Sequence, residues 1–318
     1  MTKRSRTSLL LLSATAMAGT TEAFYLHSLS IRSPSLKPTF RTIREDSKLA
    51  FQPHTRPLVS EIVTGTHSHE FWRKERTAEE VRAHVQTCLD DITQQTDDDD
   101  TRPTAHVVSS EPPLVLIHDF LSTSMCKNLI DTATSTDKMI RSTTGSEQET
   151  STIRTSTTVW LNDEQVPETS RIIAEKISSI SGFPANHMEN LQVVRYETGQ
   201  SFKLHTDTID AYNEMDKRGR VATCLIYLAA PTIGGETLFP DVHADKAIQI
   251  RIAPRQGSAI FFWNTHEKPG SPAYDGADMF LNTDLRMRHA GMPVDGGEKW
   301  VCNRWVHPVD YGVGVRGL

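Results

Sequence analysis

Apolar positions along the chain follow two different periods, and the longer period marks helices. From residue 77 onward, apolar side chains return every three or four residues, as at Val81, Val85 and Leu89. Thr77 and Glu80 precede this run with the spacing of a capping box, in which each side chain bonds the other residue's backbone N–H. The pattern predicts one amphipathic helix in an otherwise polar region.

Two more helical segments lie within a region rich in strands. Ser122 is a suitable N-cap, and another helix is predicted from Pro167, which suits a first turn, to Gly182, which suits a C-terminal cap. Elsewhere, short apolar or alternating runs bounded by Gly and Pro indicate β-strands. These runs cover residues 114–117, 155–161, 191–196, 202–205, 221–228, 247–252, 258–263, 285–288 and 300–306.

Many short strands with few helices between them are typical of a β-sandwich or a jelly roll. The pattern therefore predicts a mainly β, α+β protein with flanking helices. We divide the chain into a targeting segment over residues 1–23, a polar extension with one helix and an acidic linker over 24–110, and a folded domain over 111–310.

The first 23 residues have the pattern of a leader. Lys3, Arg4 and Arg6 precede an apolar run over residues 9–18, which is shorter than the roughly 20 residues that span a bilayer. We expect entry into the secretory pathway, with the endoplasmic reticulum or Golgi lumen as destination and no stable membrane span after leader removal. The alternative is a plastid reached by a two-part leader, because residues 24–44 are rich in Ser and Arg and lack acidic residues.

Composition narrows the choice of partner without naming a function. The 318 residues carry a formal charge of −6, so no basic surface for nucleic acid is expected. The four cysteines are too widely spaced for a zinc knuckle or a CxxC redox pair, and their pairing is left open. They are Cys88, Cys126, Cys224 and Cys302.

The strongest candidate chemistry is a metal site. His205 and Asp207 stand two residues apart at the end of an extended run, so alternation places both side chains on one face. His289 follows the extended run predicted over residues 285–288. Two histidines and one carboxylate on one side of an ion form the arrangement of non-haem iron(II) oxygenases, which keeps the other coordination positions open.

Lys299 adds a second part to the hypothesis. It begins an apolar strand ten residues after His289, where burying an ammonium group without an anion would be costly. A ligand that bears a carboxylate would supply that anion.

These residues lie in segments that resemble the prolyl 4-hydroxylases, a family of Fe(II)- and 2-oxoglutarate-dependent dioxygenases. The resemblance runs from about residue 112 to 308 in the family's order. It is carried by Arg154-Thr155-Ser156, Arg195-Tyr196-Glu197-Thr198-Gly199, His205-Thr206-Asp207, Arg220-Val221-Ala222-Thr223, Gly234-Gly235-Glu236-Thr237, Pro254-Arg255-Gln256-Gly257, His289-Ala290-Gly291 and Gly297-Glu298-Lys299-Trp300.

The resemblance implies a double-stranded β-helix (jelly-roll) core and assigns roles to matching residues. His205, Asp207 and His289 would bind iron, and Lys299 would bind the distal carboxylate of 2-oxoglutarate. The residues expected to assist are Tyr196 and Thr237 at the co-substrate, and Trp305 and Arg154 on the substrate side. Ascorbate is the further expected cofactor, and a proline-rich peptide or protein, hydroxylated to 4-hydroxyproline with release of succinate and CO2, is the expected substrate.

Two departures from the family pattern leave the choice of substrate open. Met292 stands where the family usually has cysteine, and residues 264–283 form a longer stretch than usual. One alternative is therefore the same oxygenase chemistry on a non-proline or small-molecule substrate. A catalytically silent peptide-binding module and a metal hydrolase are further alternatives, but neither explains Lys299 together with the complete triad.

Overall fold

The computed structural model describes residues 71–93 without 73, 102–142, 153–208, 219–265 and 283–311 without 309. All of them belong to one folded unit, His54–Leu318. The predicted leader, the acidic run 97–100 and most of the segments 138–152 and 264–283 lie outside the described residues.

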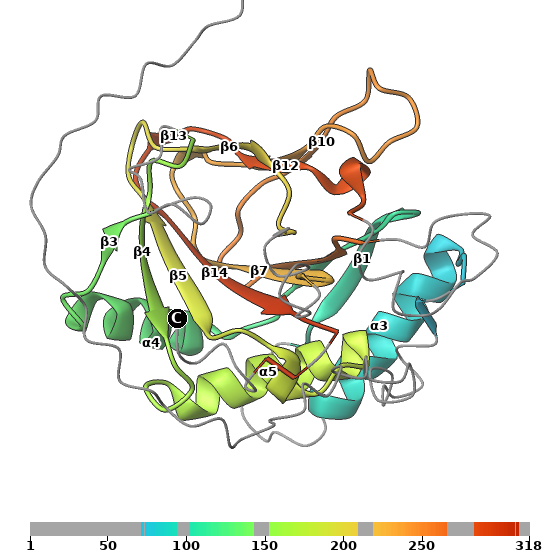
Figure 1. The fold of residues 1–318 in the computed structure, drawn as a ribbon, viewed down its shortest axis with the longest axis horizontal. Coiled ribbons are helices and arrows are strands. Elements are labelled where there is room, and N and C mark those ends of the chain that lie inside the picture. Colours follow the sequence, from blue (N-terminus) through green and yellow to red (C-terminus); the bar gives the residue numbers. More distant parts are fainter. Residues whose placement is uncertain are drawn as a thin grey trace, which may run out of the picture. The chain divides into compact units, whose positions relative to one another are not determined.

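The larger of two facing antiparallel sheets has eight strands and forms the base of the fold (Figure 1). Its order is β1-β2-β11-β7-β14-β5-β4-β3. The strands are β1 (Thr104–Ser110), β2 (Pro113–His118), β3 (Ile140–Arg141), β4 (Thr157–Leu161), β5 (Leu191–Tyr196), β7 (Ala222–Ala229), β11 (Ala259–Trp263) and β14 (Lys299–Val306).

A four-stranded sheet with the order β10-β9-β12-β6 faces the larger one, beside a two-stranded pair, β13 and β8 (Figure 1). Its strands are β6 (Phe202–His205), β9 (Thr237–Phe239), β10 (Ile250–Ile252) and β12 (His289–Gly291); the pair is β8 (Ile233–Gly234) with β13 (Val294–Gly296). The predicted mainly β jelly-roll fold is confirmed.

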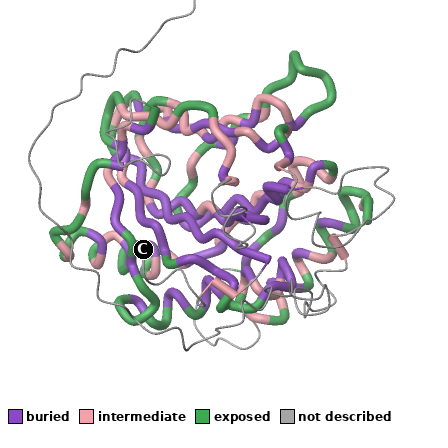
Figure 2. The backbone as a smooth tube through the Cα atoms, viewed as in Figure 1, coloured by how far each residue is buried: buried purple, intermediate pink, exposed green. Residues whose placement is uncertain are grey.

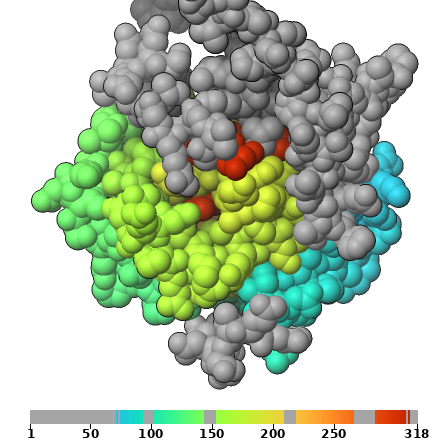
Figure 3. Space-filling view, turned by 60° about the horizontal axis from the view of Figure 1, so that its bottom comes forward, coloured from blue at the N-terminus to red at the C-terminus, as the bar shows by residue number. Residues whose placement is uncertain are grey.

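Three helices cover the face of the large sheet that points away from the small one (Figures 1 and 3). They are α3 (Ala78–Thr93), α4 (Thr123–Ser135) and α5 (Pro167–Ser181); two short 3-10 turns are η1 (Ala185–His187) and η2 (Leu285–Met287). The predicted caps are present. Ser122 Oγ accepts from Met125 N–H, and Gly182 ends α5 at φ 82°.

Strand alternation divides the buried side chains between two clusters, and Figure 2 shows that the central strands of the large sheet are buried. Cys302 and Val306 of β14 point to the helices, in a cluster that includes α5 residues. Val301 points the other way, into the space between the sheets, with Tyr227 and Phe239. The interior face of β14 is the one that carries Lys299 at its start.

Helix α3 belongs to this folded unit, although it falls within the segment assigned to the polar extension. Thr77 and Glu80 form the predicted capping box, with Thr77 N–H donating to Glu80 Oε2 at 2.8 Å. Gln86 joins the helix to the outer edge of β1: its Oε1 accepts from Ala105 N–H at 3.0 Å, and its Nε2 donates to Pro103 O at 2.9 Å. The described part of residues 24–110 thus completes the large sheet.

One predicted strand is wrong. Residues 285–288 contain the 3-10 turn η2 because Asp284 caps it, its carboxylate accepting from Arg286 N–H at 3.0 Å. A capped turn satisfies backbone donors locally, which competes with strand pairing. The chain becomes extended only at His289, where β12 begins.

The four cysteines are all buried, and none of them forms a disulfide. In the described part of the chain, no helix combines the length and apolar character needed to cross a membrane.

Gly257 provides a test of this packing. Its φ is +78°, and a Cβ there would meet the Leu121 carbonyl oxygen at less than 3.0 Å. Gly199 has a similar φ, +86°, but an added Cβ would meet nothing within 4 Å. We expect Gly199→Ala to cost about 1–2 kcal/mol, the cost of a left-handed side chain. Gly257→Ala should lose about 1–3 kcal/mol more, because overpacking is added.

Urea unfolding followed by circular dichroism measures both variants. Equal losses of unfolding free energy would show that the close approach of Gly257 to Leu121 is absent.

Candidate active site

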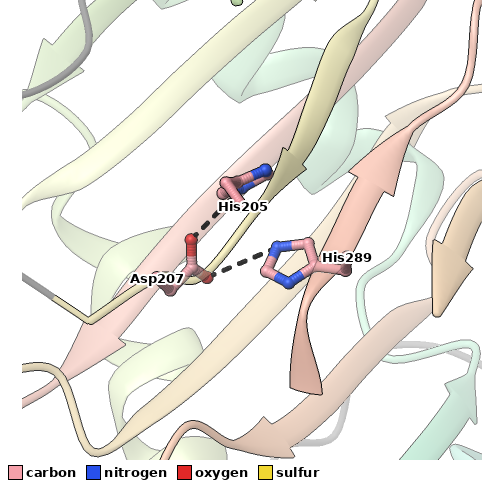
Figure 4. A group of neighbouring side chains, drawn as sticks. All are labelled: His205, Asp207 and His289. Atoms are coloured by element: carbon pink, nitrogen blue, oxygen red, sulfur yellow. Dashed lines mark ion pairs between the residues drawn. The ribbon is translucent and has the colours of Figure 1, made fainter. Parts of the chain in front are cut away.

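Three side chains meet where the ends of β6 and β12 lie side by side (Figure 4). His205 is the last residue of β6, and Asp207 lies two residues beyond it. His289 is the first residue of β12 and is paired with His205 across the two strands. The ligand atoms of all three lie within 4.8 Å of one another, as a shared metal ion requires.

Backbone contacts orient both imidazoles. His205 Nδ1 lies 2.8 Å from Lys203 O, and His289 Nδ1 lies 3.0 Å from Met287 O. A carbonyl oxygen only accepts, so each Nδ1 carries a proton, and Nε2 is the nitrogen of each ring that is left for a metal. These Nε2 atoms face Asp207, at 3.6 Å from Oδ1 for His205 and 3.7 Å from Oδ2 for His289. Histidines held in this way present Nε2 to a metal ion.

The protonation states suit the same role. Burial, followed by repulsion from His205, lowers the pKa of His289 to about 4. Burial by itself would raise the pKa of Asp207, but His289, His205 and Arg220 hold it well below its usual range. Two imidazoles and one ionised carboxylate are the donor set of a non-haem iron(II) site.

Hydrogen bonds from the large sheet also hold Asp207 in place. Thr223 of β7 donates from Oγ1 to Asp207 Oδ2 at 2.7 Å, and Asn264 Nδ2 contacts Thr223 Oγ1 at 2.8 Å. Sequence reasoning did not assign a role to Thr223 or Asn264. The signal for Thr223 was its place in an apolar strand, where a hydroxyl needs a partner.

Lys299 is buried as the sequence predicted, with 3% of its surface exposed. Its Nζ lies 5.6 Å from the Tyr196 ring centre and 5.5 Å from the Tyr227 ring centre. Among the residues that the structure describes, no carboxylate lies within 4.0 Å of this ammonium group. Burial lowers its pKa to about 7, and Glu236 opposes that effect. An anionic ligand bound to Lys299 would stabilise the charged ammonium group and raise its pKa again.

Tyr227 and Thr237 form a hydrogen-bonded pair beside Lys299. Tyr227 Oη and Thr237 Oγ1 lie 2.7 Å apart, and both residues are fully or almost fully buried. Thr237 and Tyr196 were predicted here, whereas Tyr227 was missed. Its signal was a tyrosine inside the apolar run of β7, on the interior face that alternation assigns to it.

Trp305 lies at the opposite end of β14, also on the interior face. The Arg220 guanidinium stacks 3.6 Å above its ring, and the Trp160 ring lies 5.8 Å away. Trp160 is 43% exposed, which makes it an aromatic surface at the rim. Arg220 in turn is held by the buried Glu189, whose Oε2 lies 2.9 Å from Arg220 Nη2.

Arg154 is buried, with its guanidinium hydrogen-bonded to Ser156 and Gln192 at 3.2 and 3.1 Å. Its Cζ lies 4.9 Å from the Phe202 ring centre, and that ring stacks on His205 at 3.6 Å. Arg154 is therefore one side chain removed from the metal-ligand candidates. Most of the preceding loop, residues 138–152, lies outside the described residues.

Comparison with known proteins gives this geometry a context. Residues 191–307 match the model of the 2OG-Fe(II) oxygenase superfamily. Probable prolyl 4-hydroxylase 3 of Arabidopsis thaliana is 31% identical over 228 residues, which cover 65% of this chain and 73% of that protein. Probable prolyl 4-hydroxylase 8 of the same plant is 32% identical over 225 residues, covering 64% and 72%.

Among solved structures, the 2OG complex of the viral collagen prolyl hydroxylase vCPH from Paramecium Bursaria Chlorella virus-1 has 28% identity and a TM-score of 0.45. It covers 62% of this chain and 96% of its own. The sequence relatives, matched over more than two thirds of their length, decide the assignment. The chain belongs to the prolyl 4-hydroxylase family of 2OG-Fe(II) oxygenases.

Proposed function

We propose that this protein is an Fe(II)- and 2-oxoglutarate-dependent dioxygenase that hydroxylates peptidyl proline to 4-hydroxyproline. The observation that carries the proposal is the pairing of two sites inside one sandwich. The triad of His205, Asp207 and His289 can hold the metal, and the buried Lys299, with no carboxylate partner among the described residues, can hold a dicarboxylate. A metal hydrolase would use the triad but would leave Lys299 without a function.

Each group then has one task. Iron and 2-oxoglutarate together supply the oxidation, in which O2 gives one oxygen atom to succinate, formed with CO2, and the other to the substrate C–H bond. Lys299 binds the distal carboxylate of the co-substrate, beside the Tyr227–Thr237 pair and Tyr196. The apolar interior around these groups excludes water from the reaction.

The relatives' names and the rim of the site support a proline substrate. Both plant relatives are named as probable prolyl 4-hydroxylases. The exposed Trp160 lies beside the buried Trp305, and a flat, exposed aromatic face suits the apolar proline ring. A proline-rich peptide also holds an extended polyproline II shape at little cost in entropy. Arg154, next to Phe202, would line the same side.

Two further parts of the proposal rest on the sequence and the family resemblance. Ascorbate is the expected reductant for iron that becomes oxidised in turnovers without substrate. The leader over residues 1–23 favours the secretory pathway, in the endoplasmic reticulum or Golgi lumen, with the plastid as alternative. Microscopy of the full chain fused at its C-terminus to a fluorescent protein distinguishes the two destinations.

Mass spectrometry tests the substrate directly. Polyproline and collagen-like peptides are incubated with the protein, Fe(II), 2-oxoglutarate and ascorbate, and fragment ions locate any added oxygen on proline. Succinate formation that no proline peptide stimulates would contradict the proline substrate and favour the same chemistry on another molecule. A protein that binds these peptides without forming succinate would be a binding module.

The metal ligands give a second prediction. His205→Ala and Asp207→Ala should reduce succinate formation by at least about 100-fold, because losing a ligand weakens the iron site more than losing an outer contact does. His243→Ala is the control, because His243 is an exposed histidine in the loop before β10 and is not part of the triad. Full iron-dependent turnover in His205→Ala would rule out this assignment.

Lys299 predicts a pH dependence of co-substrate binding. The dianion binds the protonated amine, whose pKa is about 7 in the free protein. The dissociation constant of 2-oxoglutarate should therefore rise above pH 7, by up to about tenfold per pH unit, until the raised pKa of the complex is passed.

Titrations under nitrogen with Mn(II) in place of iron measure this dependence. Lys299→Met should bind weakly at every pH and lose the rise above pH 7. Lys203→Met, at an exposed lysine of the same active-site region, should keep it. A dissociation constant that is flat between pH 6 and 9 in the unsubstituted protein would contradict the role of Lys299.

A further inference from the structure

A buried relay of hydrogen bonds leads from Asp207 away from the candidate metal position. Asp207 Oδ2 is 2.7 Å from Thr223 Oγ1, which is 2.8 Å from Asn264 Nδ2. Asp207, Thr223 and Asn264 are 8%, 0% and 3% exposed, so little water competes for these contacts. Thr223 lies in β7, and Asn264 directly follows β11, the strand paired with it.

The chemistry of the three groups gives the relay one direction. Asp207 is ionised and can only accept, so the single Thr223 hydroxyl proton must point to Oδ2. Thr223 Oγ1 then offers only lone pairs to its other neighbour. Asn264 must therefore present its amide NH2 rather than its carbonyl oxygen, and it blocks the rotation that would turn the hydroxyl away from Asp207.

The two oxygens of Asp207 differ as a result. Oδ2 receives a hydrogen bond to a charged acceptor, which is stronger than a neutral one. Each oxygen faces one imidazole, Oδ1 at 3.6 Å from His205 Nε2 and Oδ2 at 3.7 Å from His289 Nε2, but Oδ1 has no hydroxyl or amide donor within the described chain. The relay therefore leaves Oδ1 as the better metal ligand and makes a second bond from Oδ2 less favourable.

We propose that Asn264 is a positioning residue which, through Thr223, restricts Asp207 to binding the metal by one oxygen. The inference rests on the proposed function, because it concerns the same iron site. If each residue of the triad gave one ligand atom, a bound iron would keep positions open for the co-substrate and for oxygen. A second oxygen from Asp207 would occupy a position that the co-substrate or oxygen needs.

The Asn264 side chain can be changed without removing the backbone bonds that hold its segment. Asn264 N–H donates to Val221 O, and Asn264 O accepts from Asp284 N–H, both at 2.8 Å. The neighbouring Thr265 is a matched control. It is also buried, and its hydroxyl has no hydrogen-bond partner among the described residues.

The experiment titrates the metal-free protein with Co(II) and then the loaded protein with 2-oxoglutarate under nitrogen, following the visible absorption of cobalt. Thr223→Val and Asn264→Leu should each release Oδ2 as a second ligand atom and so tighten Co(II) binding, whereas the loss of an outer contact alone would weaken it by about 10–100-fold. Both should also weaken 2-oxoglutarate binding to the loaded protein and change the cobalt spectrum. Thr223→Ser restores the hydroxyl and should restore all three; Thr265→Val should change none.

Circular dichroism first establishes that each variant is folded, with Asn264→Ala replacing Asn264→Leu if the larger residue is not accepted. Folded variants that match the unsubstituted protein in Co(II) affinity, 2-oxoglutarate affinity and spectrum would overturn the inference. An unsubstituted protein that binds no Co(II) would overturn the metal site itself. One that binds Co(II) and 2-oxoglutarate, but hydroxylates no proline peptide, would contradict only the proposed substrate.

Discussion

Asp207 stays ionised inside an apolar sandwich because its charge has partners on several sides, and the rest of the site depends on this. A buried carboxylate without partners would take up a proton. The Thr223 hydroxyl, which donates to Oδ2, and the field of Arg220 prevent that. Lys299 has no such set of neighbours. The interior therefore holds a negative charge at Asp207 and a positive charge at Lys299 that do not pair with each other.

The antiparallel registers place these groups. His289 stands opposite His205 because β12 pairs with β6, and Lys299 stands opposite Tyr196 because β14 pairs with β5. Alternation then sends Lys299 and Val301 of β14 into the interior and Cys302 toward the helices. The same strands therefore build the core and aim the polar side chains.

Local patterns in the sequence were sufficient for the parts of the fold that local energies decide. The capping box of α3, the Ser122 cap, the Gly182 end of α5 and the strand 191–196 all follow from neighbouring residues. Short strands such as β9 and β12 escaped prediction because three residues carry too little pattern, and their pairing comes from distant segments. The triad and Lys299 were visible from spacing and family resemblance. Tyr227 was missed although alternation places it on the interior face, whereas the role of Asn264 emerges only when β11 and β7 come together.

The contact between Gln86 and β1 has a consequence for how the chain tolerates shortening. β1 is an edge strand of the large sheet. Gln86 hydrogen-bonds backbone groups at this edge, the carbonyl of Pro103 and the N–H of Ala105. Edge strands with open backbone groups recruit other chains. A fragment starting at residue 111 would lack α3 and β1 and would present β2, whose Leu114, Val115 and Ile117 are fully buried here, as a new edge. Self-association, rather than loss of the active site, is then the first hazard of truncation.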